Sequence, residues 1–118
     1  MAIDETSIQV EKQWWYKCLA ERAVQHFKKR NINAQYVATR EEAASIIMAL
    51  IPNNATIGWG DSVTLEQIRV VEKIRRTMRN RLFDPFVRDA HGELLVTGDT
   101  RLEEMKKAMM ADVFMSGV

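Results

Sequence analysis

The sequence contains a single cysteine, Cys18, and only two histidines, His26 and His91. One thiol cannot form an internal disulfide, and it cannot by itself hold a zinc ion or an iron–sulfur cluster. The two histidines lie in unrelated contexts and form no ligand pattern such as HExxH. We therefore expect no metal site and no cofactor in this chain, and we interpret Cys18 as a small apolar helix residue.

Excess charge and long apolar runs are also missing. The formal net charge is +1, which gives no general attraction to nucleic acid or to an anionic membrane. No apolar run approaches the ~18 residues that span a bilayer, and the acidic N-terminus lacks the apolar segment of a signal peptide. The 118 residues, 47% of them hydrophobic, have the composition of one globular domain over residues 1–118. We expect a cytoplasmic protein without membrane or nucleic-acid partners.

The N-terminal third is predicted to form one long helix over residues 7–31. A capping box begins at Thr6, and Asn31 suits the left-handed conformation that ends many helices. The aromatic cluster at 14–16 is interpreted as a large hydrophobic anchor, in the core or at a subunit contact. The β-forming residues at 34–38 then predict a short strand.

The middle of the chain alternates between helix and strand signals. A second capping box at Thr39 opens a helix that is apolar almost all round, which predicts deep burial, and Pro52 ends it. Residues 55–59 predict a strand that runs directly into a glycine-containing turn. Apolar residues then repeat every three or four positions from Leu65 to Met78, which predicts a single amphipathic helix. Residues 55–80 thus form a strand–loop–helix unit.

The polar face of that predicted helix is strongly basic. It carries Arg69, Lys73, Arg75, Arg76 and Arg79. A nucleic-acid interface is one interpretation, but no aromatic residues are interleaved for base stacking and the whole chain is nearly neutral. A solvated helix face is the simpler interpretation.

The C-terminal third is predicted from weaker signals. Residues 82–83 and 94–96 have the character of short strands within a loop-rich stretch. A third capping box at Thr100 predicts a helix through Met110, and residues 112–115 predict a strand. The alternation along the chain implies an α/β fold with a mostly parallel sheet and helices on its faces.

The turn Gly58-Trp59-Gly60-Asp61-Ser62-Val63-Thr64, called the glycine turn below, is the main candidate site. It follows a predicted strand, and ligands bind at the carboxyl ends of strands in open parallel sheets. Glycine allows positive φ and close approach of a ligand, and the hydroxyls of Ser62 and Thr64 suit a phosphate or a carboxylate. It matches neither the Walker A pattern nor the dinucleotide fingerprint. Two interpretations stay open: an anion site, which Asp61 disfavours, or a structural turn with Ser62 as N-cap.

Five segments of the sequence resemble the LUD-domain family, the lactate-utilisation proteins: residues 31–37, 39–43, 51–52, 57–68 and 111–117. The resemblance runs in order from about Trp14 to Val118. It implies a Rossmann-like three-layer fold similar to the sugar-phosphate isomerase and CoA-transferase superfamily. The resemblance implies that the ligand-binding residues are those at the matching positions of the loop: Gly58, Gly60, Ser62 and Thr64.

The resemblance also implies that family members act within larger assemblies. Family members are associated with lactate oxidation as parts of multi-subunit systems, which implies partner subunits. Iron–sulfur ligands, where the family has them, lie in other subunits or domains. No catalytic residue is assigned. Glu66 is the nearest carboxylate that could act on a bound ligand, and its other interpretation is a favourable charge near a helix N-terminus.

Three departures from the family pattern stand out. Asp61 and Arg69 occupy positions where we expect glycine, and family members typically continue well past the equivalent of Gly117. We therefore expect the N-terminal portion of a family member, an apparently truncated domain. Surface that the rest would cover predicts self-association through Trp14, Trp15 or the 113–115 strand. The alternative to a ligand-binding LUD-type domain is thus a non-catalytic remnant or an oligomerising interaction module.

Overall fold

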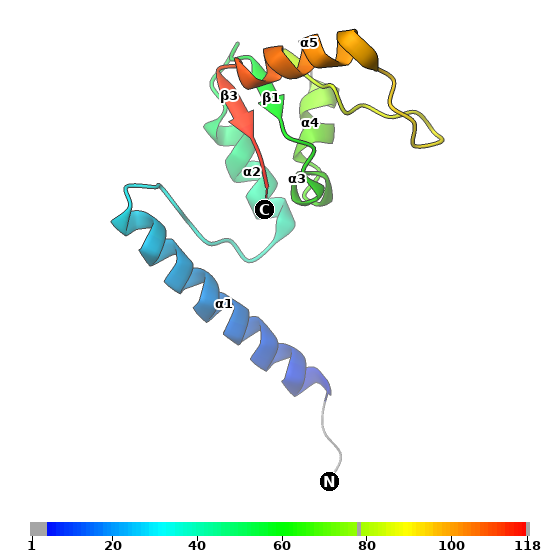
Figure 1. Cartoon of the computed structure of the whole chain (residues 1–118). Coiled ribbons are helices and arrows are strands. Elements are labelled where there is room, and N and C mark those ends of the chain that lie inside the picture. The colour runs from blue at the N-terminus through cyan, green and yellow to red at the C-terminus, as the bar shows by residue number, and fades with distance from the viewer. Residues whose placement is uncertain (1–4, 78, 118) are drawn as a thin grey trace. The chain divides into compact units, whose positions relative to one another are not determined.

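The computed structural model describes residues 5–77 and 79–117. Within them lie five helices and three strands. In chain order these are α1 (Glu5–Lys29), α2 (Arg40–Leu50), β1 (Ile57–Trp59), α3 (Val63–Gln67), α4 (Val70–Thr77), β2 (Leu82–Phe83), α5 (Gly98–Met109) and β3 (Val113–Met115). The packing divides the chain after Thr39 into two compact units, which we describe separately (Figure 1).

The first unit consists of α1 and the segment that follows it. Asn31 has φ 61°, and the Ile32 N–H donates to the Phe27 carbonyl at 3.0 Å. This left-handed ending confirms the predicted helix end. Thr6 lies inside α1, so the prediction that it caps the helix is wrong. None of the helices in the described ranges combines the length and the apolar character that crossing a bilayer requires.

Two other predictions for the first unit are corrected. The aromatic side chains Trp14, Trp15 and Tyr16 are 64%, 54% and 63% exposed, so they are not core residues, and the subunit contact stays a prediction. Residues 34–38 form no strand. Their composition favours β structure, but a strand also needs a hydrogen-bonded neighbour, and the sheet of the described residues contains only β1, β2 and β3.

The second unit is built on a three-stranded parallel sheet in the order β2-β1-β3. Ile57 pairs with Leu82 on one side and with Val113 on the other. The strand prediction at 82–83 is therefore confirmed, and those at 55–59 and 112–115 are confirmed for their last three residues. The segment 94–96 contributes only one isolated antiparallel bridge, Arg88 to Leu94.

Side chains alternate across β1, and the helices follow that alternation. Ile57 and Trp59 are fully buried in a cluster with Ala44 of α2, Leu65 of α3 and Val70, Val71 and Ile74 of α4. Gly58 points to the other face, where a Cβ would overlap the Ala108 backbone of α5. The fold is thus α/β, with α2, α3 and α4 packed on one face of the sheet and α5 on the other (Figure 1).

The predicted single helix from Leu65 to Met78 is wrong, because the chain breaks between α3 and α4. Ile68 is the C-cap of α3, and Arg69 takes a left-handed conformation with φ 63°. The break re-aims the chain so that Val70, Val71 and Ile74 all reach the core. Met78 lies outside the described residues.

The helices α2 and α5 differ from their predictions in smaller ways. Thr39 immediately precedes α2 and Pro52 follows its end, as predicted. However, only Ala44 of α2 is fully buried and Leu50 is exposed, because α2 packs mainly against α4, so the prediction of deep burial is wrong. The helix α5 begins at Gly98, so Thr100 lies inside it and is not its cap.

Candidate functional site

The glycine turn lies at the carboxyl edge of the sheet, where β1 and β3 end side by side. The Gly60 N–H donates to the Met115 carbonyl at 3.0 Å. A Cβ on Gly117 would overlap the Ser62 hydroxyl, so the chain after β3 lies directly against the turn after β1. The chain passes from β1 to β2 on one side and returns to β3 on the other, so the strand order reverses between β1 and β3. Open α/β sheets bind ligands at such a reversal.

Ser62 has the structural role that one interpretation gave it. Its backbone is extended, with φ −88° and ψ 123°, and its Oγ accepts from the Leu65 N–H at 3.2 Å. The residue is only 8% exposed. The interpretation of Ser62 as the N-cap of α3 is confirmed, whereas ligand binding by Ser62 stays a prediction. Thr64 is exposed in the first turn of α3, as is Glu66, where a carboxylate is electrostatically favourable.

The two glycines of the turn act differently from our expectation. Neither Gly58 nor Gly60 has a positive φ; the left-handed residue of the turn is Asp61, with φ 50°. Gly58 is needed because α5 approaches its Cα, and the first contact of a Cβ at Gly60 would be the Phe114 ring at 3.4 Å. The expectation that these glycines supply positive φ is therefore wrong, while Gly60 is exposed and has the Phe114 ring and the Ser116 hydroxyl as its nearest neighbours.

A cation that the sequence did not identify faces Asp61. The Arg88 guanidinium lies 3.9 Å from the Asp61 carboxylate, and its Nη1 donates to the Gly92 carbonyl at 3.1 Å. Both charged side chains are nearly half exposed. Arg88 comes from the stretch between β2 and α5, where no periodic pattern is present, so no signal in the sequence could have placed it beside the glycine turn.

A second cluster, next to the turn, combines the indole of Trp59 with the charged side chains of Asp84 and Arg75. Trp59 is 1% exposed, and its Nε1–H donates to Asp84 Oδ1 at 2.9 Å. The second oxygen of Asp84 accepts from Arg75 Nε at 2.6 Å. An apolar cavity of about 240 Å³ lies beside Trp59, and Gly60, Phe86, Met105 and Phe114 are among the residues that line it. Since both oxygens of Asp84 are engaged, its role is to hold β2, α4 and Trp59 together.

A third polar cluster ties the amino ends of β1 and β3. One Asp112 oxygen accepts from the Thr56 N–H at 2.9 Å and from the Thr56 hydroxyl at 3.0 Å, and the Asp112 N–H donates back to that hydroxyl. These hydrogen bonds from Thr56 hold the pKa of Asp112 below its ordinary value. This clamp lies at the end of the sheet opposite the glycine turn, so it serves strand alignment.

Replacing Asp112 with alanine is expected to lower stability in a pH-dependent way. A carboxyl whose pKa is lowered by folding stabilises the native state above its unfolded pKa of about 3.9, and that contribution is lost as the pH falls through the native pKa. The urea midpoint of Asp112→Ala should therefore fall below that of the wild type at pH 7, and the difference should shrink as the pH falls below about 3.9. Asp112→Asn is the control, because it keeps an acceptor but does not titrate. A constant difference across this pH range would contradict the assignment.

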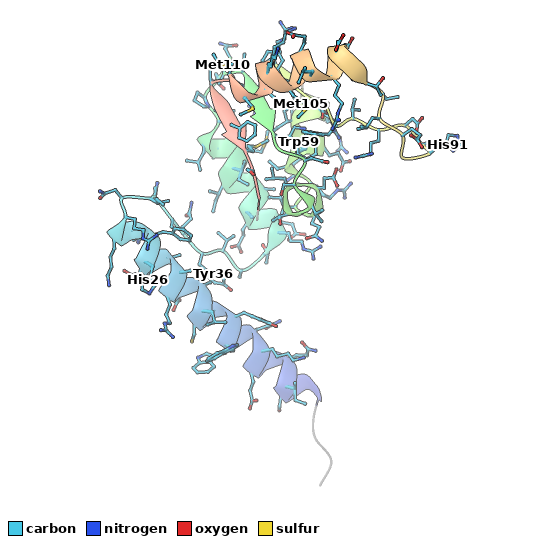
Figure 2. All side chains as sticks on the ribbon, viewed as in Figure 1. His26, Tyr36, Trp59, His91, Met105 and Met110 are labelled. Carbon is cyan, nitrogen blue, oxygen red and sulfur yellow. The ribbon has the colours of Figure 1, made fainter. Side chains whose placement is uncertain are left out.

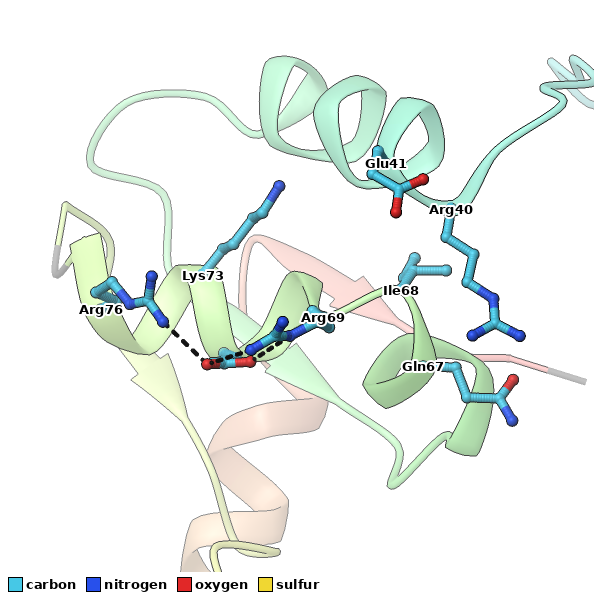
Figure 3. A pocket seen from close by; sticks show the side chains of 8 residues that line it. Arg40, Glu41, Gln67, Ile68, Arg69, Lys73 and Arg76 are labelled. Atoms are coloured by element: carbon cyan, nitrogen blue, oxygen red, sulfur yellow. Dashed lines mark hydrogen bonds and ion pairs between the residues drawn. The ribbon is translucent and has the colours of Figure 1, made fainter.

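A basic hollow lies on the α2–α4 face, away from the glycine turn. It has a volume of about 360 Å³ and is lined by Arg40, Glu41, Gln67, Ile68, Arg69, Glu72, Lys73 and Arg76. Arg69 pairs with Glu72 at 2.8 Å, and Arg76 pairs with the same carboxylate at 2.9 Å. The hydrogen bond from Arg69 lowers the pKa of Glu72. Arg69, Lys73 and Arg76 of the predicted basic face line this hollow, and Arg40, from α2, joins them (Figure 3).

Two histidines remain among the candidate metal ligands of the sequence. His26 lies near the end of α1 and His91 in the loop between β2 and α5, both exposed (Figure 2). No group of three or more histidine, cysteine or carboxylate side chains comes together among residues 5–77 and 79–117.

These features define a small α/β domain with a serine-capped turn where its parallel sheet reverses strand order. Compared with known protein families, residues 20–118 match the LUD domain. Because this match covers most of the chain, the protein belongs to the LUD domain family, as its motifs predicted. The matched range begins after Trp14 and Trp15. Neither a curated protein nor a solved structure matches the chain.

Proposed function

We propose that this LUD domain binds a small anion, a hydroxy acid or a phosphate-bearing compound, at the glycine turn. The proposal includes the finer fold assignment, a Rossmann-like three-layer domain of the sugar-phosphate isomerase and CoA-transferase type, with helices on both faces of the parallel sheet. It also includes a cytoplasmic setting in which partner subunits of a lactate-oxidation system supply the redox centres.

The observation that carries the proposal is the position of Arg88. An unpaired Asp61 would repel an anion from the turn, but the Arg88 guanidinium at 3.9 Å offsets that charge. At this distance the two groups attract each other without a hydrogen bond. A guanidinium has five N–H donors, and Arg88 uses one of them for Gly92. The others are suited to a carboxylate or a phosphate.

The surroundings of the turn fit a ligand with one anionic end and a short carbon chain. Thr64 offers an exposed hydroxyl, and Gly60 is an exposed residue of the turn. The apolar cavity beside Trp59 borders Gly60 and has room for a few carbon atoms. A hydroxy acid carries both a carboxylate for Arg88 and a small apolar group for this cavity.

Thermal unfolding with added lactate, acetate or phosphate tests the proposal. An anion at ten times its dissociation constant adds about 1.4 kcal/mol to the free energy of unfolding, which raises Tm by about 5 °C in a domain of this size. Arg88→Gln is expected to abolish the shift given by lactate or acetate, and Thr64→Val to reduce it. Asp61→Asn is expected to increase it, because asparagine keeps the left-handed backbone and removes the competing charge.

The matched control is Arg79→Gln, which removes another exposed arginine of the same unit. It should leave the ligand-induced shift unchanged. The proposal fails if no anion at 10 mM shifts Tm in either the wild type or Asp61→Asn.

The second candidate is a non-catalytic module that oligomerises with itself. It is favoured by the exposure of Trp14 and Trp15 on α1 and of Phe114 on β3, an edge strand of the sheet in the described residues. Sedimentation of the full chain separates the two candidates. A clean monomer at high concentration removes the second.

A further inference from the structure

We propose that the basic hollow is a second binding site, for a small polyanion that carries at least two phosphate groups. This site does not depend on the proposed function of the glycine turn, because it is formed by the start of α2, the end of α3 and one face of α4. Its volume of about 360 Å³ lies within the range of small-molecule sites in proteins.

The charges around the hollow favour an anion. Four cations and two carboxylates line it, which leaves a surplus of two positive charges. Glu72 bridges Arg69 and Arg76, with Arg69 held by two hydrogen bonds of 2.8 and 3.1 Å. This bridge restrains two guanidinium groups on one rim. It therefore reduces the loss of side-chain conformational entropy when a ligand binds.

The other two cations have no competing partner among the described residues. Neither the Arg40 guanidinium nor the Lys73 ammonium makes an ion pair or a side-chain hydrogen bond there. Figure 3 shows them on either side of Ile68, one from α2 and the other from α4. Positive groups on two elements that are far apart in sequence thus face one hollow from different directions.

The backbone at Arg69 supplies an independent observation. A non-glycine residue with φ 63° is strained, and such residues concentrate at functional sites. The family resemblance leads us to expect glycine at this position, which would remove the strain. Arginine here keeps the strain and places a guanidinium on the rim of the hollow.

The spread of the cations determines the class of ligand. Arg69 and Arg76 are 69% and 74% exposed, so a single negative charge would be screened by salt and held weakly. A ligand with two or more phosphate groups can contact the Arg69–Arg76 rim, Arg40 and Lys73 together, and arginine binds phosphate oxygens through two parallel hydrogen bonds. A monocarboxylate cannot do so.

Calorimetric titration with pyrophosphate, at constant ionic strength, tests the site. Wild-type protein is expected to bind pyrophosphate at least tenfold more tightly than inorganic phosphate. Arg40→Met and Lys73→Met should each weaken pyrophosphate binding about tenfold, the usual effect of losing a charge-assisted hydrogen bond. Lys107→Met removes an exposed lysine of α5 that does not line the hollow, and it should bind like the wild type.

Arg69→Gly separates a binding role from a purely structural one. Glycine relieves the left-handed backbone and loses only an exposed ion pair, so Tm should rise by about 3 °C or more. Pyrophosphate binding should weaken about tenfold in the same variant. Equal weakening by Lys107→Met, or no pyrophosphate binding at 10 mM, would overturn the proposal. So would tighter binding of single-stranded RNA that is lost in the same variants.

Discussion

Gly58→Ala is expected to destabilise the second unit by about 3 kcal/mol or more, the upper end of overpacking costs. A Cβ at this position would overlap the carbonyl of Ala108, because α5 crosses β1 at its central residue. Backbone atoms of a helix cannot turn aside as a flexible side chain can. Small domains have a total stability of about 5–15 kcal/mol, so the loss is large. Urea unfolding followed by far-UV circular dichroism measures it.

Gly60→Ala is the matched control for this prediction. Its Cβ would meet side-chain atoms rather than backbone, the Phe114 ring at 3.4 Å and the Ser116 hydroxyl at 3.5 Å, and its φ is not positive. It should change stability by less than about 1 kcal/mol. Because the overlap at Gly58 involves the backbone of Ala108, the additional change Ala108→Gly should not rescue Gly58→Ala. Rescue, or equal effects of the two glycine variants, would contradict the helix placement.

Trp59→Ala is expected to cost about 3–5 kcal/mol, the usual loss for a buried aromatic side chain. The Trp59 residue is only 1% exposed. Its ring packs edge-on against the Phe86 ring, with 5.5 Å between the ring centroids, and its Nε1–H donates to Asp84 Oδ1 at 2.9 Å. Trp59→Phe keeps most of the packing and loses the hydrogen bond, so it should cost about 1–2 kcal/mol. Both values come from urea unfolding at pH 7, followed by circular dichroism.

Trp14→Ala is the control that separates burial from residue type. Trp14 is 64% exposed on α1, and substitutions at exposed positions usually change stability by less than about 0.5 kcal/mol. If Trp14→Ala were as costly as Trp59→Ala, the aromatic cluster of α1 would be buried at a subunit contact.

The pattern of the sequence predicted the position of the glycine turn, but it did not predict all the side chains that contact the turn. Alternating helix and strand signals and the family motif placed it correctly at the carboxyl end of a strand. Its capping serine was also identified as one of two interpretations, since N-caps are local features. Arg88 could not be found in this way, because its approach to Asp61 depends on the path of a loop that has no periodicity.

Two of the three departures from the family pattern, Asp61 and Arg69, are explained by the backbone conformation of the structure. Asp61 and Arg69, where we expected glycine, both have positive φ, at 50° and 63°. Aspartate tolerates this conformation better than arginine does. The same geometry broke the predicted long helix at Arg69, because a left-handed residue ends one helix and starts the next in a new direction.

By itself, the sequence determined the class of the fold and the approximate positions of the three strands, because hydrophobic periodicity and turn chemistry are local. Its motifs, and not these patterns, indicated the family. Only the tertiary structure decided which residues meet. It made Gly58 a packing requirement of α5, set Arg88 beside Asp61 and brought Arg40 to the basic face of α4. Such contacts join residues far apart in the chain, and no local pattern specifies the direction in which those elements pack.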